Sequence, residues 1–372
     1  MERLSVKGKG KLARMDFAIF ITVLALCGIG LVMVFSASYY SAQEKWSDGL
    51  LYVRKQATYL AIALPCLLLL TRVNYHILEK LKTPALAISV VLLIAVLIFG
   101  KEENGAKRWL IIAGQSMQPS EVAKFGMIIY MSAFMSRRQQ LMQDFVKGLV
   151  PMLMVIGLIC GLVMLQPNMS MAVIIGMMGI VMLYVGGASV KHIAILMFCG
   201  IVLFVLFAVI EPYRFARLTS FTDPWKDPAD TGYQLIQSLY ALGSGGLFGQ
   251  GLNNSRQKLL YLTYGESDFV FSIVGEELGF IGAACVILLY LFIVYRGIRV
   301  ALRCRDRFGS MLAAGITTVF ALQVAVNIGV VTGAMPTTGQ ALPFVSAGGS
   351  SLLIFLSAMG VLLNISRYTA DM

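Results

Sequence analysis

The sequence predicts an all-α polytopic membrane protein with about ten transmembrane helices. Of its 372 residues, 58% are hydrophobic and only 13% are charged, whereas soluble domains carry about 25% charged residues. Apolar runs recur along the whole chain, most of them near the roughly 20 residues that a helix needs to cross a bilayer. A soluble protein could not solvate this much apolar surface, so we expect the lipid bilayer to cover most of it.

Ten apolar segments follow one another, several of them interrupted by glycine or proline. Membrane helices tolerate such interruptions where neighbouring groups satisfy the backbone. The first segment is too long for a signal-peptide core and lacks a clear cleavage site, so we expect it to be retained. The fifth and sixth segments are separated by Gln166-Pro167-Asn168, which reads as a tight turn. The expected spans are residues 17–39, 56–72, 84–100, 120–136, 148–166, 169–187, 191–210, 269–295, 311–333 and 344–366.

The distribution of Lys and Arg predicts the orientation. A net charge of +11 raises the possibility of nucleic-acid binding, but in a membrane protein the simpler explanation is cytoplasmic anchoring, and we expect no nucleic-acid partner. Five arginines lie between residues 296 and 307, which marks that short loop as cytoplasmic. Both termini and the tail 1–16 are then cytoplasmic, and 211–268 is a large extracytoplasmic loop. The chain 1–372 reads as one transmembrane domain.

A stretch from Gly249 to Phe280 carries carboxylates into an apolar run. Asp268 lies where the long loop becomes a helix. It is either a first-turn residue stabilised by the helix N-terminus or a general base at the membrane surface. Glu276 and Glu277 lie deeper, where carboxylates are costly. We expect them to shape a cavity, to point apart so that they do not readily share a partner, and to pair at least once with a cation such as Lys124.

A second polar cluster lies on the outer side of the fourth span. Ser120 is a plausible N-cap, and Glu121 and Lys124 are one helical turn apart on one face. They form either a local ion pair in a capped helix or a site where Lys124 faces a cavity and meets an anion. Arg108 next to Trp109 is either an interfacial anchor or a bidentate contact for phosphate.

A third polar cluster interrupts the last apolar region. Residues 335–351 contain Pro336, Pro343 and several glycines among polar residues such as Ser346 and Ser350. We expect a non-helical element at membrane depth, which requires burial in protein or a cavity to line. The alternative is a simple loop. The six cysteines show no metal or disulfide spacing and read as small buried hydrophobes, so no metal-ligand cluster is predicted.

Short motifs in these clusters form one pattern along the chain. They are GLVMVFSAS at 30–38, KRW at 107–109, QPSE at 118–121 with Lys124, QK at 257–258, ESDFVF at 266–271, EELG at 276–279, Asn327 followed by GAMPTTG at 333–339, and LPFVSAGGSS at 342–351. Together they resemble the SEDS family, which includes FtsW, RodA and SpoVE, over essentially the whole chain. The early segment looks most like the FtsW and SpoVE branch, whereas Asn168, Gln340 and Ala347 depart from the usual family pattern.

The resemblance implies a peptidoglycan glycosyltransferase that polymerises lipid II at the outer face of the bacterial cytoplasmic membrane with a class B penicillin-binding protein. It does not specify division, elongation or sporulation. Asp268 is the predicted catalytic base, and a divalent cation, Mg²⁺ or Mn²⁺, is the one cofactor that the chemistry admits. The predicted substrate-binding residues are Arg108, Glu121, Lys124, Arg214, Lys258, Ser346 and Ser350, and the predicted cavity residues are Glu276, Glu277 and Pro343.

Two other functions compete with this prediction. A flippase that moves lipid II outward would also use carboxylates and a lysine within the membrane. The enzyme is favoured because the polar residues gather on the outer side, whereas transporters bind their substrates near the midplane. A scaffold without activity is the third possibility, and an assay with labelled lipid II distinguishes the three.

Overall fold

The computed structural model describes residues 14–103, 105–112, 114–210 and 220–369. Within these ranges, eight helices are long and apolar enough to cross a membrane, and Met169–Val185 is a shorter apolar helix. The helices are α1 Phe17–Trp46, α2 Leu51–Arg72, α3 His76–Lys80, α4 Lys82–Phe99, α5 Pro119–Arg137, α6 Val150–Met164, α7 Met169–Val185, α8 Val190–Ile210, α10 Tyr233–Ser244, α11 Val270–Arg303, α12 Arg307–Val331 and α13 Gly349–Ser366, with the short turns η1 Gln139–Gln143, η2 Phe145–Leu149 and η3 Pro224–Lys226.

Each of the ten predicted spans corresponds to one helix of the bundle, and eight of these helices are long and apolar enough to cross a membrane, so the predicted helical membrane fold is confirmed. The prediction underestimated the two longest helices. α1 continues to Trp46 and α11 to Arg303, because both helices extend past the apolar segment into polar sequence. The predicted turn at 166–168 is also confirmed, and the Asn168 side chain caps α7 by accepting from the Met171 amide at 3.3 Å.

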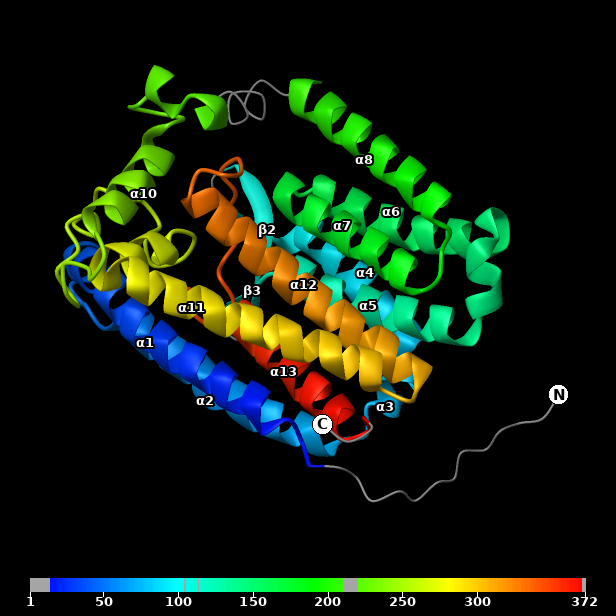
Figure 1. The fold of residues 1–372 in the computed structure, drawn as a ribbon. Helices are drawn as coiled ribbons and strands as arrows, with labels where there is room; N and C mark the ends of the chain where they lie inside the picture. The colour runs from blue at the N-terminus through cyan, green and yellow to red at the C-terminus, as the bar shows by residue number, and fades with distance from the viewer. Residues whose placement is uncertain (1–13, 104, 113, 211–219, 370–372) are drawn as a thin grey trace.

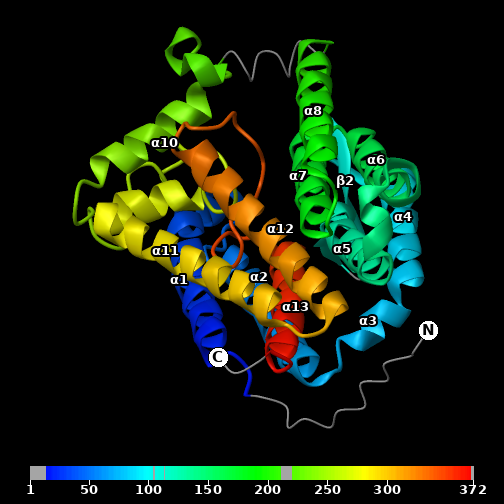
Figure 2. The same cartoon turned by 45° about the vertical axis from the view of Figure 1, so that its right-hand side comes forward.

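α12 is the central helix of the bundle. It packs against α11 and α13 on one side and against α5 and α7 on the other. α1 and α2 lie beside α11 and α13, while α4 and α6 flank α5 (Figure 1). α8 packs against α7 at the edge of the molecule (Figure 2). The arrangement places segments from both halves of the chain around α12, where the polar residues described below are found.

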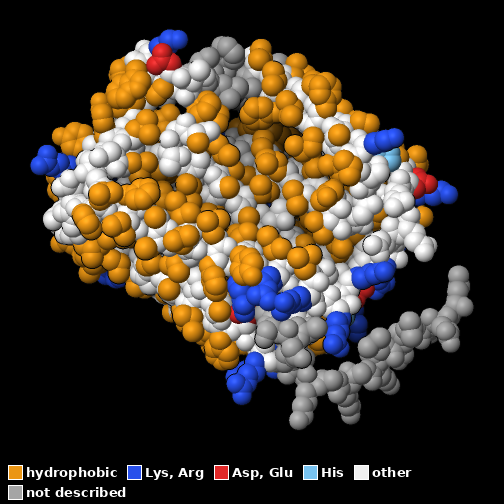
Figure 3. Space-filling model, viewed as in Figure 1, with side chains coloured by type: hydrophobic (Ala, Val, Ile, Leu, Met, Phe, Trp, Pro, Cys, Tyr) orange, Lys and Arg blue, Asp and Glu red, His pale blue; other side chains and the backbone are white. Residues whose placement is uncertain are grey.

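The connecting segments separate into two groups at opposite ends of the bundle. At one end, the Asp16 amide donates to Ser366 Oγ at 3.0 Å, and Arg296 forms a 2.8 Å ion pair with Asp16. Lys and Arg gather around this end, whereas the middle of the visible face is mostly hydrophobic (Figure 3). At the other end, Ser346 contacts the backbone of Ser267. This grouping agrees with the predicted alternation of loops between two sides.

A small antiparallel sheet, which the all-α prediction missed, precedes α5. Its strands are β1 Lys101–Glu103, β2 Ala106–Ile112 and β3 Gln115–Met117, in the order β1-β2-β3. The sequence does carry a hairpin signal, Asn104-Gly105, because Asn-Gly favours two-residue β-turns. β1 and β3 have only three residues each, so no alternating pattern of apolar and polar residues marked the sheet in the sequence.

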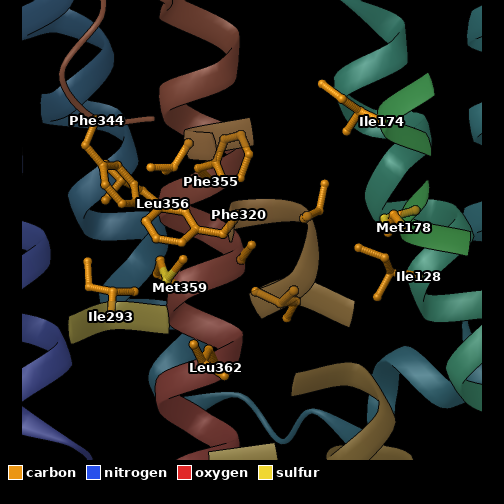
Figure 4. Close-up of a cluster of buried hydrophobic side chains, with 14 of the residues drawn as sticks. Ile128, Ile174, Met178, Ile293, Phe320, Phe344, Phe355, Leu356, Met359 and Leu362 are labelled. Atoms are coloured by element: carbon orange, nitrogen blue, oxygen red, sulfur yellow. The ribbon is translucent and has the colours of Figure 1, made fainter. Parts of the chain in front are cut away.

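Buried hydrophobic side chains fill the core around α12, and Phe320, Phe344 and Phe355 pack together within it (Figure 4). The ring of Phe320 lies 5.8 Å from Tyr290, 5.6 Å from Phe344 and 6.1 Å from Phe355, measured between centroids. The Tyr290 hydroxyl donates to the carbonyl of Pro343 at 2.5 Å, so this buried polar group is satisfied. The cluster fixes the segment between α12 and α13 against the helices.

Candidate active site

The loop that ends at Asp268 is held through three consecutive carbonyl groups. Asn327 Nδ2 donates to the carbonyl of Asp268 at 2.8 Å, Ser346 Oγ donates to that of Ser267 at 2.5 Å, and the Ala347 amide donates to that of Glu266 at 2.9 Å. All three donors come from the end of α12 or from the segment that follows it. Residues far apart in sequence therefore fix the backbone of residues 266–268.

Asp268 lies at the predicted junction of loop and helix, two residues before α11 begins at Val270, and its side chain is half-buried. Gly339 lies beside its carboxylate, because a Cβ added to this glycine would be 3.2 Å from Asp268 Oδ2. Asn327 links the two segments, since its Nδ2 also donates to the carbonyl of Gln340 at 2.7 Å. A half-buried carboxylate on a fixed backbone has the placement that a general base needs.

Glu266 is the second carboxylate of this loop. It is half-buried, and burial raises the pKa of its carboxyl group, while its own backbone amide and the ammonium group of Lys45 oppose that rise. Lys45 is exposed in the last turn of α1. The loop thus presents two carboxylates, two residues apart, with the exposed ammonium group of Lys45 nearby. Lys45 was not among the predicted site residues.

Lys124 is completely buried and forms a local ion pair. Its ammonium group lies 3.0 Å from Glu121 Oε2 and donates to Gln323 Oε1 at 2.5 Å. The predicted pairing of Lys124 with Glu276 or Glu277 is wrong, because Glu121 lies on the same helical face one turn away. Ser120 is also not the N-cap, since Gln118 occupies that position and Pro119 begins α5.

Two amides on one face of α12 connect these groups. Gln323 accepts from Lys124 and donates through Nε2 to the carbonyl of Ala341 at 3.0 Å. Asn327, four residues later, holds the carbonyls of Asp268 and Gln340. Gln323 was not predicted from the sequence as a functional residue, and Asn327 was recognised only as part of a motif. Two carboxamides four residues apart within an apolar helix are the signal that could have identified both.

Glu276 and Glu277 form a buried network with the residues 253–258. Lys258 Nζ lies 3.1 Å from Glu277 Oε1 and donates to Ser36 Oγ at 3.1 Å. Ser255 bonds both carboxylates, through Oγ to Glu276 at 2.5 Å and through its amide to Glu277 at 3.3 Å. The expectation that the two glutamates do not readily share a partner is therefore wrong, because Ser255 reaches one with its side chain and the other with its backbone.

The break in α11 explains how these carboxylates are accommodated. Gly279 has φ 67° and ψ −171°, which is not helical, so the segment with Glu276 and Glu277 is set off from the rest of α11. Residues 246–251 run alongside and satisfy the backbone, with the Gln250 amide donating to the carbonyl of Glu276 at 2.9 Å and the Phe280 amide to that of Gly246 at 2.8 Å. A side chain at 279 would collide with the backbone of residues 247–249.

The segment between α12 and α13 is non-helical, and its second half, residues 340–346, is mostly buried, which confirms the predicted non-helical element and argues against a simple loop. Pro343 is buried, and Phe344 has a φ of 69°, a strained conformation for a bulky residue. Ser346 and Ser350 are buried, and Ser350 Oγ accepts from the Gln118 amide at 3.3 Å. In this structure both hydroxyls hold backbone, and their predicted contact with substrate stays a prediction.

The predicted cations divide into two kinds. Lys124 and Lys258 are buried, and their ammonium groups face Glu121 and Glu277, so their contact with substrate stays a prediction. Arg108 is half-buried on β2 and donates to the carbonyls of Gln166 and Pro167 at the α6–α7 turn. Arg214 lies outside the described residues.

No group of three or more His, Cys, Asp or Glu residues gathers within the described ranges. The divalent cation, Mg²⁺ or Mn²⁺, stays a prediction, and no step below uses it. The six cysteines are free, and only Cys27 is fully buried, while Cys199 and Cys285 are exposed. Their reading as small buried hydrophobes is wrong for those two, which lie on helix faces at the surface.

Comparison with known proteins agrees with this architecture. Residues 17–371 match the family model described as cell cycle protein, which covers FtsW, RodA and SpoVE. The chain is 42% identical over 356 residues to stage V sporulation protein E of Bacillus subtilis, covering 95% of this chain and 97% of that protein. It is 40% identical over 361 residues to a probable peptidoglycan glycosyltransferase FtsW of Trichlorobacter lovleyi, covering 96% and 94%.

Solved structures share the fold. A chain from a peptidoglycan synthase complex, described as coordinating polymerization and crosslinking, superposes with a TM-score of 0.79 at 28% identity over 95% of this chain and 98% of that one. The rod shape determining protein RodA of Thermus thermophilus gives a TM-score of 0.69 at 25% identity over 96% and 98%. The extent of these matches, together with the motifs that hold the Asp268 loop, establishes that the chain is a multi-pass membrane protein of the FtsW, RodA and SpoVE family.

Proposed function

We propose that this protein is a peptidoglycan glycosyltransferase that polymerises lipid II and works with a class B penicillin-binding protein. Relatives over nearly the whole chain carry the name peptidoglycan glycosyltransferase, and a chain of the same fold belongs to a peptidoglycan synthase complex. The observation that carries the proposal is the fixed backbone under Asp268, where three carbonyls are each bonded from the α12–α13 region.

The reaction joins two lipid-linked sugars. A hydroxyl group of the acceptor attacks the anomeric carbon of the donor, the new glycosidic bond forms, and the bond from that carbon to the pyrophosphate breaks. Asp268 accepts the proton that the hydroxyl loses, and the lipid pyrophosphate leaves with the bonding electrons. A general base at this step is typically worth about 10²–10⁴-fold in rate.

Charge on the leaving pyrophosphate requires cations near Asp268. Lys45 is exposed and close enough to Glu266 to influence its carboxyl group, which makes it a candidate for this role. Arg108 is the second candidate, because a guanidinium group can bond phosphate oxygens in pairs. Lys124 and Lys258 contribute in a different way, by neutralising buried carboxylates that hold the surrounding segments.

We further propose that the Asp268 end of the bundle faces outward and that both termini are cytoplasmic. Arg296 pairs with Asp16 at the opposite end, and the other arginines of 296–307 lie at the end of α11 and the start of α12, where a cytoplasmic position is favoured. Single cysteines at exposed positions Asn254 and Arg305, introduced into a cysteine-free variant, should react with a membrane-impermeant reagent from opposite sides. Reaction of both from the same side would contradict the orientation.

Purified protein with its partner, given labelled lipid II in vesicles, tests the function itself. The glycosyltransferase predicts glycan polymer. Translocation of lipid II without polymer would favour the flippase, and neither product would favour a scaffold. The enzyme is preferred because Asp268, Glu266 and Lys45 gather at one end of the bundle, not at the midplane.

A further inference from the structure

A basic groove lies at the end of the bundle that holds Asp16 and Ser366. Its volume is about 350 Å³, and it is formed where the start of α1, the end of α2 and the end of α13 meet. Its cationic lining residues are Arg14, Arg72 and Arg367, and no carboxylate of the described residues lines it. Within the same part of the chain, no ion pair neutralises any of these three arginines.

The arginines stand at the border between polar and apolar surface. Arg14 and Arg72 are exposed, and Arg367 is half-buried, with one guanidinium nitrogen donating to the carbonyl of Thr71 at 3.2 Å. Asp16 is the nearest described carboxylate in sequence to Arg14, but it is buried and engaged by Arg296 at 2.8 Å. Counted over the described residues alone, the groove therefore carries a positive charge, which attracts an anion.

Apart from Thr71, the rest of the groove is lined by the apolar side chains of Met15, Phe17 and Leu68. Phe17 is 54% exposed and Leu68 is 47% exposed, and both line the groove below the arginines. A free phosphate ion would gain nothing from these side chains, whereas the first carbons of a lipid acyl chain would bury them. Basic pockets between membrane helices are suited to anionic lipid headgroups.

This groove is separate from the candidate active site. α2 connects the two ends of the bundle, from Leu51 to Arg72, and 22 helical residues span about 33 Å. The Asp268 loop lies toward the Leu51 end, because Gln56 of α2 donates to the carbonyl of Ser346, and the Ser346 hydroxyl donates to the carbonyl of Ser267. The lipid-linked substrate of the proposed reaction would therefore not reach the arginines with its reacting pyrophosphate.

We propose that Arg14, Arg72 and Arg367 form a binding site for the phosphate of an anionic phospholipid, with its acyl chains against Phe17 and Leu68. The site holds the start of α1 to the ends of α2 and α13 through one headgroup. It does not depend on the glycosyltransferase reaction, so its test is a binding measurement on the full-length protein.

Native mass spectrometry of the delipidated protein, titrated with dioleoylphosphatidylglycerol in detergent, gives the test. The Arg14→Gln/Arg72→Gln variant should bind this lipid about 30-fold more weakly, the factor expected for two interfacial arginines, and each single variant about 5-fold more weakly. The matched control is Arg305→Gln/Arg307→Gln, which removes two exposed arginines outside the groove and should bind as the wild type does.

Three results would overturn the proposal. Equal weakening in both double variants would show a general charge effect. Equal binding of zwitterionic dioleoylphosphatidylcholine would show that the arginines do not select an anion. Displacement of the phosphatidylglycerol by millimolar inorganic phosphate would assign the groove to free phosphate and not to a lipid.

Discussion

The side chain of Asn327 holds the main chain of Asp268, because Asn327 Nδ2 donates to the Asp268 carbonyl at 2.8 Å. The same nitrogen donates to the carbonyl of Gln340 at 2.7 Å, so one buried carboxamide joins the loop before α11 to the segment before α13. The position of the Asp268 carboxylate therefore depends on Asn327, which acts through the backbone that carries it.

The first prediction concerns Asn327→Leu, which keeps the approximate size and removes both donors. Polymerisation of lipid II should fall by roughly 10²-fold, because a shift of about 1 Å at a reacting group costs that much. Turnover per folded molecule is the measurement. Asn364→Leu is the matched control, because Asn364 is also buried and bonds the backbone of Thr71 and Tyr75, at the opposite end. Equal loss of turnover in both variants would argue against a positioning role.

The second prediction concerns the space beside the carboxylate. A Cβ at position 339 would lie 3.2 Å from Asp268 Oδ2, tighter than ordinary contact, so Gly339→Ala should displace the carboxylate and lower the polymerisation rate. Gly348→Ala serves as the control, because its Cβ would meet its nearest neighbour at 3.5 Å. Unchanged rates in Gly339→Ala would show that the carboxylate does not need its present position.

The third prediction concerns the buried pair of Lys124 and Glu121. Lys124→Met leaves Glu121 buried without its cation, which typically costs about 3–5 kcal/mol. The melting temperature in detergent should fall, and Lys124→Met/Glu121→Gln should recover part of the loss because no charge is then stranded. A single variant that melts with the wild type would contradict the pairing.

The fourth prediction follows from Glu266. Burial raises the pKa of its carboxyl group above the ordinary 4.5, so the folded state binds this proton more tightly than the unfolded state does. Its contribution to the free energy of unfolding becomes less favourable as the pH rises from 4.5 through the folded pKa. Glu266→Gln removes this effect, so its melting temperature should exceed that of the wild type at about pH 8 and approach it at about pH 4.5. A pH-independent difference would contradict the shift.

The sequence was sufficient to predict the helical membrane fold, because apolar length alone specifies where a helix can cross a bilayer. It also predicted the turn capped by Asn168 and the buried non-helical element around Pro343, since both depend on local residue types. The three strands near 101–117 were missed because β1 and β3 have only three residues each, too few to show an alternating pattern in the sequence.

The sequence did not predict which charged residues form ion pairs with one another. Lys124 pairs locally with Glu121, while Glu277 pairs with Lys258 from the loop that precedes α11. Choosing between these partners requires the break at Gly279, which brings residues 246–251 alongside the glutamates. A break of this kind depends on tertiary contacts, so the pattern of apolar residues in the sequence does not predict it.

The role of Asp268 as the catalytic base is tested by measuring polymerisation of lipid II with the Asp268→Asn variant. The variant keeps the shape of the side chain and should fold and bind its partner, yet its rate should fall by about 10²–10⁴-fold. Glu266→Gln, measured beside it, should retain most of the rate. Near-normal polymer from Asp268→Asn together with loss in Glu266→Gln would assign the catalytic base to Glu266. Normal polymer from both variants would contradict a catalytic role for this loop.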